Sequence, residues 1–326
     1  MPPAAAHNRH RSSLEGIIDF STQASLTPAQ RLSAGRRFTQ LVDHFDVPNS
    51  GSIKGYDRVK LVRLTYEYAR SKESKDNFLR AFFEFAELPM NEDEDINIDL
   101  GDADRRARLR DSLFDFAEYL FENFFLPLKA CTKKTPQPSP AAHSAIQRVQ
   151  GEGHAFSGTP ERVSALRAAC LDPSKEVALK ILNMFDSGAA FLVEGTEIDR
   201  PRNAMTLAHH LHHVFGEFKI FFEPVDDQPY TYRIDMFGNR FFLGNLLPVT
   251  RTLYLTESRT IDPPSARLLA IHNAIAHILH LSAAGEYIDK ILRDLEEYGV
   301  RADGSTELDR FVKLRLDGWP VGEVGG

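Results

Sequence analysis

The spacing of hydrophobic residues predicts helices through the first part of this chain of 326 residues. Thr27 followed by Gln30 is a capping-box signature, and Pro28 stands at the first helical position behind it. Apolar residues then recur with a period of about 3.6 residues, which is typical of amphipathic helices. The same period continues through residues 57–71, 75–88 and 104–128. We therefore expect a helical N-terminal domain, residues 1–130, with a core rich in phenylalanine.

The stretch 131–159 is dense in Pro, Gly, Ser and Lys and has no sustained hydrophobic period, so we interpret it as a linker. Beyond it, residues 160–170 and 173–186 are again spaced as helices. A short helix that ends at Gly216 follows. We assign residues 160–326 to a C-terminal domain.

After Gly216, apolar and polar residues alternate in two runs on either side of Asp226 and Asp227, which predicts an antiparallel hairpin. A third strand is expected at residues 249–255, and helices at 264–282 and 286–298 follow it. The expected fold class is α+β and mainly α, with a small antiparallel sheet in the C-terminal domain.

Charge and cysteine content limit the partners and the compartment. The 39 basic and 46 acidic residues give a net charge of -7, so any contact with nucleic acid has to be local. Cys131 and Cys170 form neither a disulfide framework nor a metal knuckle, which is typical of a reducing compartment. The sequence lacks an apolar run of about 18 residues and a secretory h-region. We therefore expect no membrane contact and an intracellular location, cytoplasmic or nuclear.

The stretch NAMTLAHHLHHVFG, residues 203–216, holds the strongest candidate chemistry. Its pattern predicts an asparagine in a turn, a strand-like apolar run at 204–207, and a helix with four histidines. On a helical wheel, His209, His212 and His213 lie opposite the apolar side of that helix. Histidines three or four positions apart can share or flank one cation. The alternative is a solvated helix face that happens to be rich in histidine.

A second group, His272, His277 and His280, lies on the helix expected at 264–282. The three side chains fall on different sides of its apolar stripe and are not expected to converge on one ion. Motifs of dinucleotide-binding folds, phosphate-binding loops and serine esterases are absent from the sequence. These histidines are interpreted as structural.

The stretch EIDRPRNAMTLAHHLHHVFGEFKIFFEP, residues 197–224, resembles the C-terminal half of the HNH endonuclease motif of fungal HNH-nuclease-domain proteins. Runs such as KLVRLTYEYARS and DPSKEVALKILNMFDSG are similar to other segments of those proteins. The resemblance implies a ββα-metal unit, about residues 183–224, that cleaves phosphodiester bonds of nucleic acid with a divalent cation, Mg²⁺ or Zn²⁺. Asn203 matches the loop asparagine that orients water, and His212 matches the metal-binding helical histidine.

This chain departs from the family between Cys170 and Asp172. At that point family members carry an additional segment with the first strand and the histidine that acts as general base. Loss of a general base costs ~10²–10⁴ in rate, so we expect an incomplete HNH unit with little or no turnover. Residues 204–207 would also lack the strand that pairs with them in the family.

Two other functions remain open from the sequence. The chain could be a non-catalytic helical binding or regulatory protein, in which His212 has no measurable role. It could also be a zinc-stabilised structural module that uses His209 and His213 with ligands from elsewhere. No protein partner is predicted.

Overall fold

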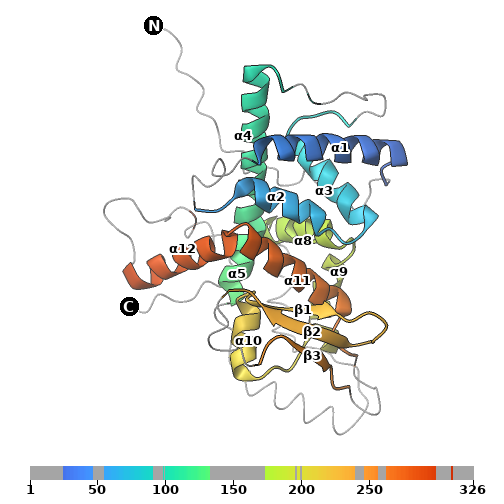
Figure 1. The fold of residues 1–326 in the computed structure, drawn as a ribbon, viewed down its shortest axis with the longest axis vertical. Helices are drawn as coiled ribbons and strands as arrows, with labels where there is room; N and C mark the ends of the chain where they lie inside the picture. The colour runs from blue at the N-terminus through green and yellow to red at the C-terminus, as the bar shows by residue number, and fades with distance from the viewer. Residues whose placement is uncertain are drawn as a thin grey trace.

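The computed structural model describes residues 25–46, 55–90, 98, 100–132, 173–194, 197–198, 200–238, 246–255, 262–298 and 310. Most of these residues are helical, and one three-stranded antiparallel sheet lies among them. The prediction of a mainly helical α+β fold is therefore confirmed. Figure 1 shows the N-terminal helices at one end of the molecule and the sheet at the other.

The first three helices begin where the sequence predicts helices, and each has a side-chain cap. They are α1 (Pro28–Phe45), α2 (Arg58–Glu67) and α3 (Lys72–Phe85). The capping box is confirmed, because Thr27 Oγ1 accepts from the Gln30 amide at 3.2 Å and Gln30 Oε1 accepts from the Thr27 amide at 3.1 Å. Asp57 caps α2 and Ser71 caps α3 in the same way.

The helix predicted at residues 104–128 is one long helix with a π-helical turn inside it. It consists of α4 (Ala103–Leu120), the π-helix η1 (Phe121–Phe125) and α5 (Leu126–Thr132). The helical prediction is confirmed, and the π-helical turn is a new finding. A π turn places its side chains out of the regular 3.6-residue register, and such turns occur often at functional positions.

The C-terminal part combines helices with the sheet. Its helices are α8 (Pro173–Phe185), α9 (Ala190–Val193), the 3₁₀ turn η3 (Pro201–Asn203), α10 (His209–Gly216), α11 (Ala266–Leu281) and α12 (Ala284–Tyr298). Its strands are β1 (Ile220–Pro224), β2 (Thr231–Met236) and β3 (Val249–Thr252), paired antiparallel in the order β1-β2-β3. The predicted hairpin, third strand and final two helices are confirmed. The helix predicted at 160–170 lies outside the described residues.

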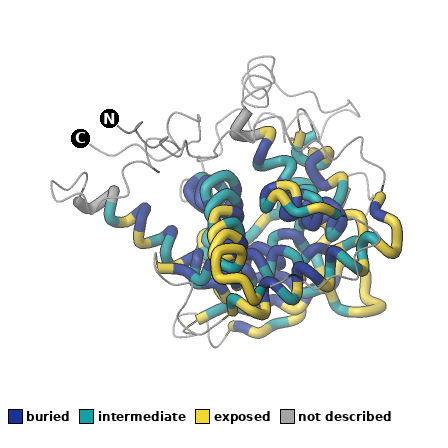
Figure 2. The backbone as a smooth tube through the Cα atoms, turned by 90° about the horizontal axis from the view of Figure 1, so that it is seen from above, coloured by how far each residue is buried: buried dark blue, intermediate teal, exposed yellow. Residues whose placement is uncertain are grey.

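Strand β1 separates two hydrophobic clusters. Ile220 and Phe222 belong to a small cluster between the sheet and α10, whereas Phe221 belongs to a large cluster formed mainly by the helices. This alternation follows from the strand geometry, in which successive side chains point to opposite faces. Figure 2 shows the buried residues gathered between the helices and the exposed ones along their outer faces.

The large cluster contains residues from both sides of the predicted linker. Phe124 and Phe125 of η1 contact Phe185 of α8, with ring centroids 5.4 and 6.3 Å apart. The predicted division into residues 1–130, 131–159 and 160–326 stays a prediction, because residues 133–172 are not among those described.

The strand-like run predicted at residues 204–207 has no pairing strand among the described residues, as the departure from the family leads us to expect. The backbone there is extended, with φ -120° and ψ 140° at Ala204, but these residues belong to no strand. Met205 and Leu207 instead pack against the small hydrophobic cluster. Side chains two positions apart lie on the same face of an extended segment. The alternation of apolar residues here therefore indicates that one face is buried, and it does not require pairing in a sheet.

Candidate functional site

Asn203 closes the loop that leads from α9 to α10. Its side-chain Nδ2 donates to the backbone carbonyls of Leu192 and Glu197, each at 2.7 Å. Its Oδ1 is buried and accepts no hydrogen bond from the described residues. Both donor hydrogens of the amide therefore hold the loop backbone in place.

The same loop is fastened at two further points. Arg202 forms an ion pair with Glu197, and the carbonyl of Arg202 accepts from the amide of Ser265 at 2.8 Å. Ser265 is the N-cap residue of α11. The loop is thus held both within itself and against the start of α11.

Helix α10 presents its apolar side to the sheet, and its residues His212 and His213 are exposed. Leu211 and Val214 pack against the small hydrophobic cluster, as the helical wheel predicts, and so does Phe215. His212 is exposed, and the 65% exposed side chain of His213 has its Nε2 3.3 Å from Glu217 Oε1. The side chains of His209 and His210 lie outside the described residues.

The structure does not bring Asn203 and His212 into direct contact. The Asn203 amide is taken up by loop carbonyls, and no hydrogen bond joins these two described residues. The roles assigned to them from the resemblance, water orientation and metal binding, stay predictions.

His272 lies beside α10 as a half-buried aromatic residue. Its ring stacks on Phe215 with centroids 3.8 Å apart and an interplanar angle of 5°, and on Phe218 at 4.7 Å and 20°. Its Nε2 lies 2.9 Å from the Phe215 carbonyl oxygen. Burial lowers the pKa of His272 to about 4, so the ring is neutral near pH 7 and Nε2 carries the donated proton.

The other two histidines of α11 lie among aromatic rings. His277 contacts Tyr68 and Phe221, with ring centroids 5.4 and 4.6 Å apart, and its Nδ1 lies 2.8 Å from the Asn273 carbonyl oxygen. His280 stacks on Phe237 at 4.4 Å. These contacts give both residues the structural role that the sequence analysis expected.

We tested whether the side chains around His212 fit a divalent cation. Among the residues whose side chains are described, no three His, Cys, Asp or Glu residues are placed to hold a metal ion. His212 supplies one exposed nitrogen, and its neighbour His213 faces Glu217. The described residues therefore do not fit a resident cation, and the expected Mg²⁺ or Zn²⁺ stays a prediction.

The residues that hold α10 in place were not predicted from the sequence. His272 stacks on Phe215 and Phe218, and it hydrogen-bonds to the Phe215 carbonyl, 57 residues away in the sequence. No local sequence pattern could therefore reveal these contacts. Glu197 and Arg202 are close in the sequence, so an ion pair between them could be proposed. That proposal would also require the conformation of the turn between them.

A comparison with protein families gives one match. A family model described as HNH endonuclease matches residues 154–223. The match includes α8, the loop with Asn203, α10 with His212, and nearly all of β1. No curated protein and no solved structure matches the chain. The matched residues thus suggest a relationship to HNH-type nucleases.

No single helix among the described residues is long and apolar enough to cross a membrane. Residues 266–281 and 284–294 satisfy the length and composition criteria only as a pair, and the axis bends by 80° between them.

Proposed function

We propose that this chain is an HNH-endonuclease-type protein that contacts nucleic acid locally at α10 and cleaves phosphodiester bonds slowly or not at all. The family match over residues 154–223 carries the nuclease relationship. The reduced turnover is inferred from the sequence, because no histidine lies between His154 and His209 in the matched range. The segment that would carry the general base is therefore proposed to be missing.

The positions of Asn203 and His212 favour contact with a phosphate over catalysis of its cleavage. The Asn203 amide fixes the loop that enters α10, and this holds the outer face of the helix in one orientation. The exposed imidazole of His212 can donate one hydrogen bond to a phosphate oxygen. Without a base to remove a proton from water, such a contact binds the phosphate but does not activate the nucleophile.

We assign no reaction step to a metal ion, because the described residues do not fit one. An intracellular location, cytoplasmic or nuclear, is part of the same proposal. It rests on two cysteines without a disulfide framework and on a nucleic-acid ligand. No protein partner is proposed.

A nicking assay tests the turnover. The full chain is incubated with supercoiled plasmid and Mg²⁺, Mn²⁺ or Zn²⁺, with and without chelator, beside His212→Ala and His44→Ala. His44 is an exposed histidine on α1, outside the matched range, and serves as the matched control. We expect all three proteins to give the background rate within about twofold, since a missing base costs ~10²–10⁴. Metal-dependent nicking that disappears only in His212→Ala would refute the proposed loss of turnover.

A binding assay tests the nucleic-acid contact separately. Fluorescence anisotropy with a labelled duplex is expected to give a dissociation constant on the order of 10⁻⁵ M at low salt, in the range of non-specific binding. His212→Ala should weaken binding about threefold or more, in line with loss of one hydrogen bond, and His44→Ala should not. Equal binding by all three proteins would contradict a contact at α10.

A further inference from the structure

The buried residue Arg310 contacts the helical bundle. It is 4% exposed, although it lies 192 residues from Glu118 and 23 residues from Tyr287 in the sequence. The guanidinium forms an ion pair with Glu118, and its Nε lies 3.6 Å from Glu122 Oε1. Its Nη1 donates to the Tyr287 hydroxyl at 3.4 Å.

Aromatic rings lie on either side of these polar contacts. The Arg310 guanidinium carbon is 5.1 Å from the centre of the Phe121 ring and 5.7 Å from that of Tyr287. Tyr56 stacks on Phe121 at 4.6 Å with an interplanar angle of 12°. Planar guanidinium groups bind favourably over aromatic faces, particularly where water is excluded.

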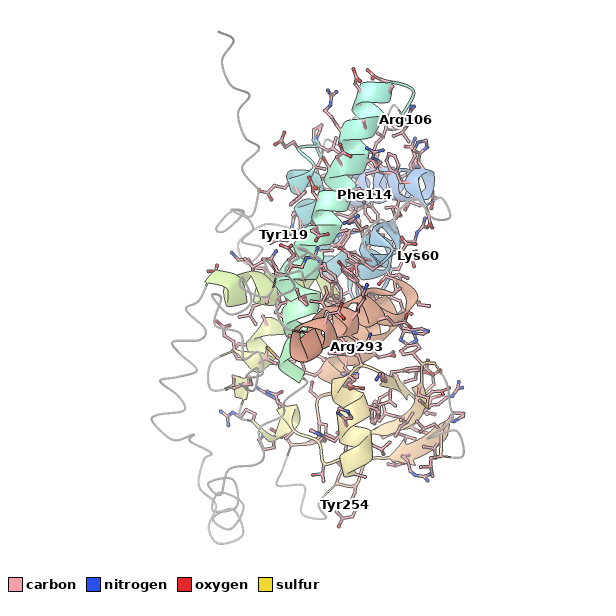
Figure 3. The ribbon with its side chains drawn as sticks, turned by 90° about the vertical axis from the view of Figure 1, so that its left-hand side faces the viewer. Lys60, Arg106, Phe114, Tyr119, Tyr254 and Arg293 are labelled. Atoms are coloured by element: carbon pink, nitrogen blue, oxygen red, sulfur yellow. The ribbon has the colours of Figure 1, made fainter. Side chains whose placement is uncertain are left out.

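The long helix and α12 build this site together. Glu118 comes from α4, and Phe121 and Glu122 come from the π-helical turn η1. Tyr287 comes from α12, which packs beside α5. In Figure 3, α12 with the labelled Arg293 lies beside the lower end of the long helix.

Tyr56 and Arg58 hold the carboxylate of Glu118 in place independently of Arg310. Its Oε2 accepts from the Tyr56 hydroxyl at 3.0 Å and from Arg58 Nη2 at 3.3 Å. The contact with Arg310 uses the other oxygen, Oε1. One oxygen of the carboxylate is therefore held by the bundle, and the other is directed at the guanidinium.

Arg310 lies between the carboxylates of Glu118 and Glu122. Arg58 also pairs with Glu118. The pKa of Tyr56 is raised, chiefly by burial and then by the charge of Glu118, so its hydroxyl stays protonated and donates. A guanidinium at this position offsets the cost of placing two carboxylates in a partly buried site.

We propose that Glu118, Glu122, Phe121 and Tyr287 form a guanidinium-binding site in the helical bundle, and that Arg310 occupies it and thereby joins position 310 to α4, η1 and α12. The donors of a guanidinium suit two carboxylates and a hydroxyl better than an ammonium does, because they are planar and fixed in direction. This site is separate from the candidate nuclease site and does not depend on the proposed function.

Chemical rescue tests the proposal in the full chain. Arg310→Ala is expected to lower the melting temperature by about 5–10 °C, because Glu118 and Glu122 lose the buried guanidinium that lies between them. Ethylguanidinium at about 10 mM, a concentration suited to a weak small ligand, should recover at least half of this loss. Ethylammonium at the same concentration should recover much less, and neither compound should stabilise the wild-type protein, whose site is filled.

Three further variants define the outcome. Arg310→Lys keeps the charge but not the planar donors, so its melting temperature should lie between those of wild type and Arg310→Ala. Arg293→Ala removes an exposed arginine of α12 and should leave the melting temperature within about 1 °C. Arg310→Ala combined with Glu118→Gln should no longer respond to ethylguanidinium. An unchanged melting temperature in Arg310→Ala, or equal rescue by the two compounds, overturns the proposal.

Discussion

The ring of His272 has the structural role expected from the sequence, although its contacts were not predictable. It lies five positions from His277 on one helix and is packed between Phe215 and Phe218. The ring is neutral because its buried position disfavours the charged form, and its Nδ1 accepts no hydrogen bond from the described residues. His272 therefore joins α10 to α11 as an aromatic residue with one polar contact.

Stability should fall in acid because of this residue. The pKa of His272 is lowered from 6.5 to about 4, chiefly by burial, so below pH 6.5 the unfolded chain binds a proton that the folded chain does not. The contribution of His272 is complete above pH 6.5 and is lost progressively as the pH falls toward 4. The loss amounts to roughly 3 kcal/mol, from about 1.4 kcal/mol per unit of pKa. Denaturant unfolding at a series of pH values measures it.

His272→Phe isolates the effect, since phenylalanine keeps the stack but cannot take up a proton. The Phe215 carbonyl also accepts from the Phe218 amide at 3.0 Å, so it is not left without a donor. The variant should lose less stability than wild type between pH 6.5 and 4, whereas His280→Phe, at an exposed histidine, should follow wild type. Parallel pH profiles for wild type and His272→Phe would contradict the assignment.

At the scale of elements, the turn before α2 meets α12 at Gly55. This residue has φ +91°, and a Cβ there would lie 2.6 Å from Cδ2 and 2.9 Å from Cε2 of Tyr287. Gly55→Ala should therefore destabilise the protein by about 2–4 kcal/mol, through backbone strain and overpacking together. Denaturant unfolding measures the change, and the Tyr287 ring that contacts Arg310 should be displaced.

Gly238 separates the two causes. It has φ +79°, but a Cβ at this position meets nothing within 4 Å. Gly238→Ala should cost only the backbone strain, about 1 kcal/mol. Equal losses in the two variants would show that contact with Tyr287 contributes nothing.

The elements themselves were largely predictable from local pattern. The helix that starts at Thr27, the hairpin around Asp226 and Asp227, and the last two helices all follow from period and turn chemistry. The π-helical turn Phe121–Phe125 was not predictable, because its sequence, FENFF, is compatible with both helix types. The run at 204–207 was expected to lack a pairing strand, and burial of one of its faces explains the strand-like alternation.

The candidate site was predictable only in part. Its residues were located by resemblance, and the family match covers the same stretch. Their surroundings depend on contacts that span long separations, such as the Phe215 carbonyl with His272 and the Arg202 carbonyl with Ser265. Such contacts follow from how elements dock, and a single sequence gives no direct signal for docking.

At the scale of the whole molecule, Asp186 joins three helices. It lies just after α8 and is 8% exposed. Its carboxylate accepts from Arg70 Nη1 at 3.1 Å and from Arg267 Nε and Nη2 at 2.9 and 2.8 Å. Arg70 follows α2 and Arg267 begins α11, so one carboxylate holds segments from both sides of the predicted linker. The hydrogen bond to Asp186 is the main cause of the raised pKa of Arg267.

This junction and the shared phenylalanine cluster predict that the described helices unfold together. Asp186→Asn keeps the shape of the side chain but removes its charge, which leaves two arginines without their anion. We expect a loss of about 1–3 kcal/mol, less than for a fully buried pair because Arg70 and Arg267 are 38% and 45% exposed. Asp111→Asn, at an exposed carboxylate paired with Arg110, should change stability by less than about 0.5 kcal/mol.

Calorimetry distinguishes a shared core from two independent domains. A core that includes Phe124, Phe125 and Phe185 should give one cooperative transition, and Asp186→Asn should move the whole transition to lower temperature. Two independent domains would give two transitions, of which Asp186→Asn would move only one. In that case residues 1–130 would also unfold as a separate fragment with unchanged melting temperature, whereas a shared core predicts that the fragment exposes Phe124 and Phe125 and loses its cooperative transition.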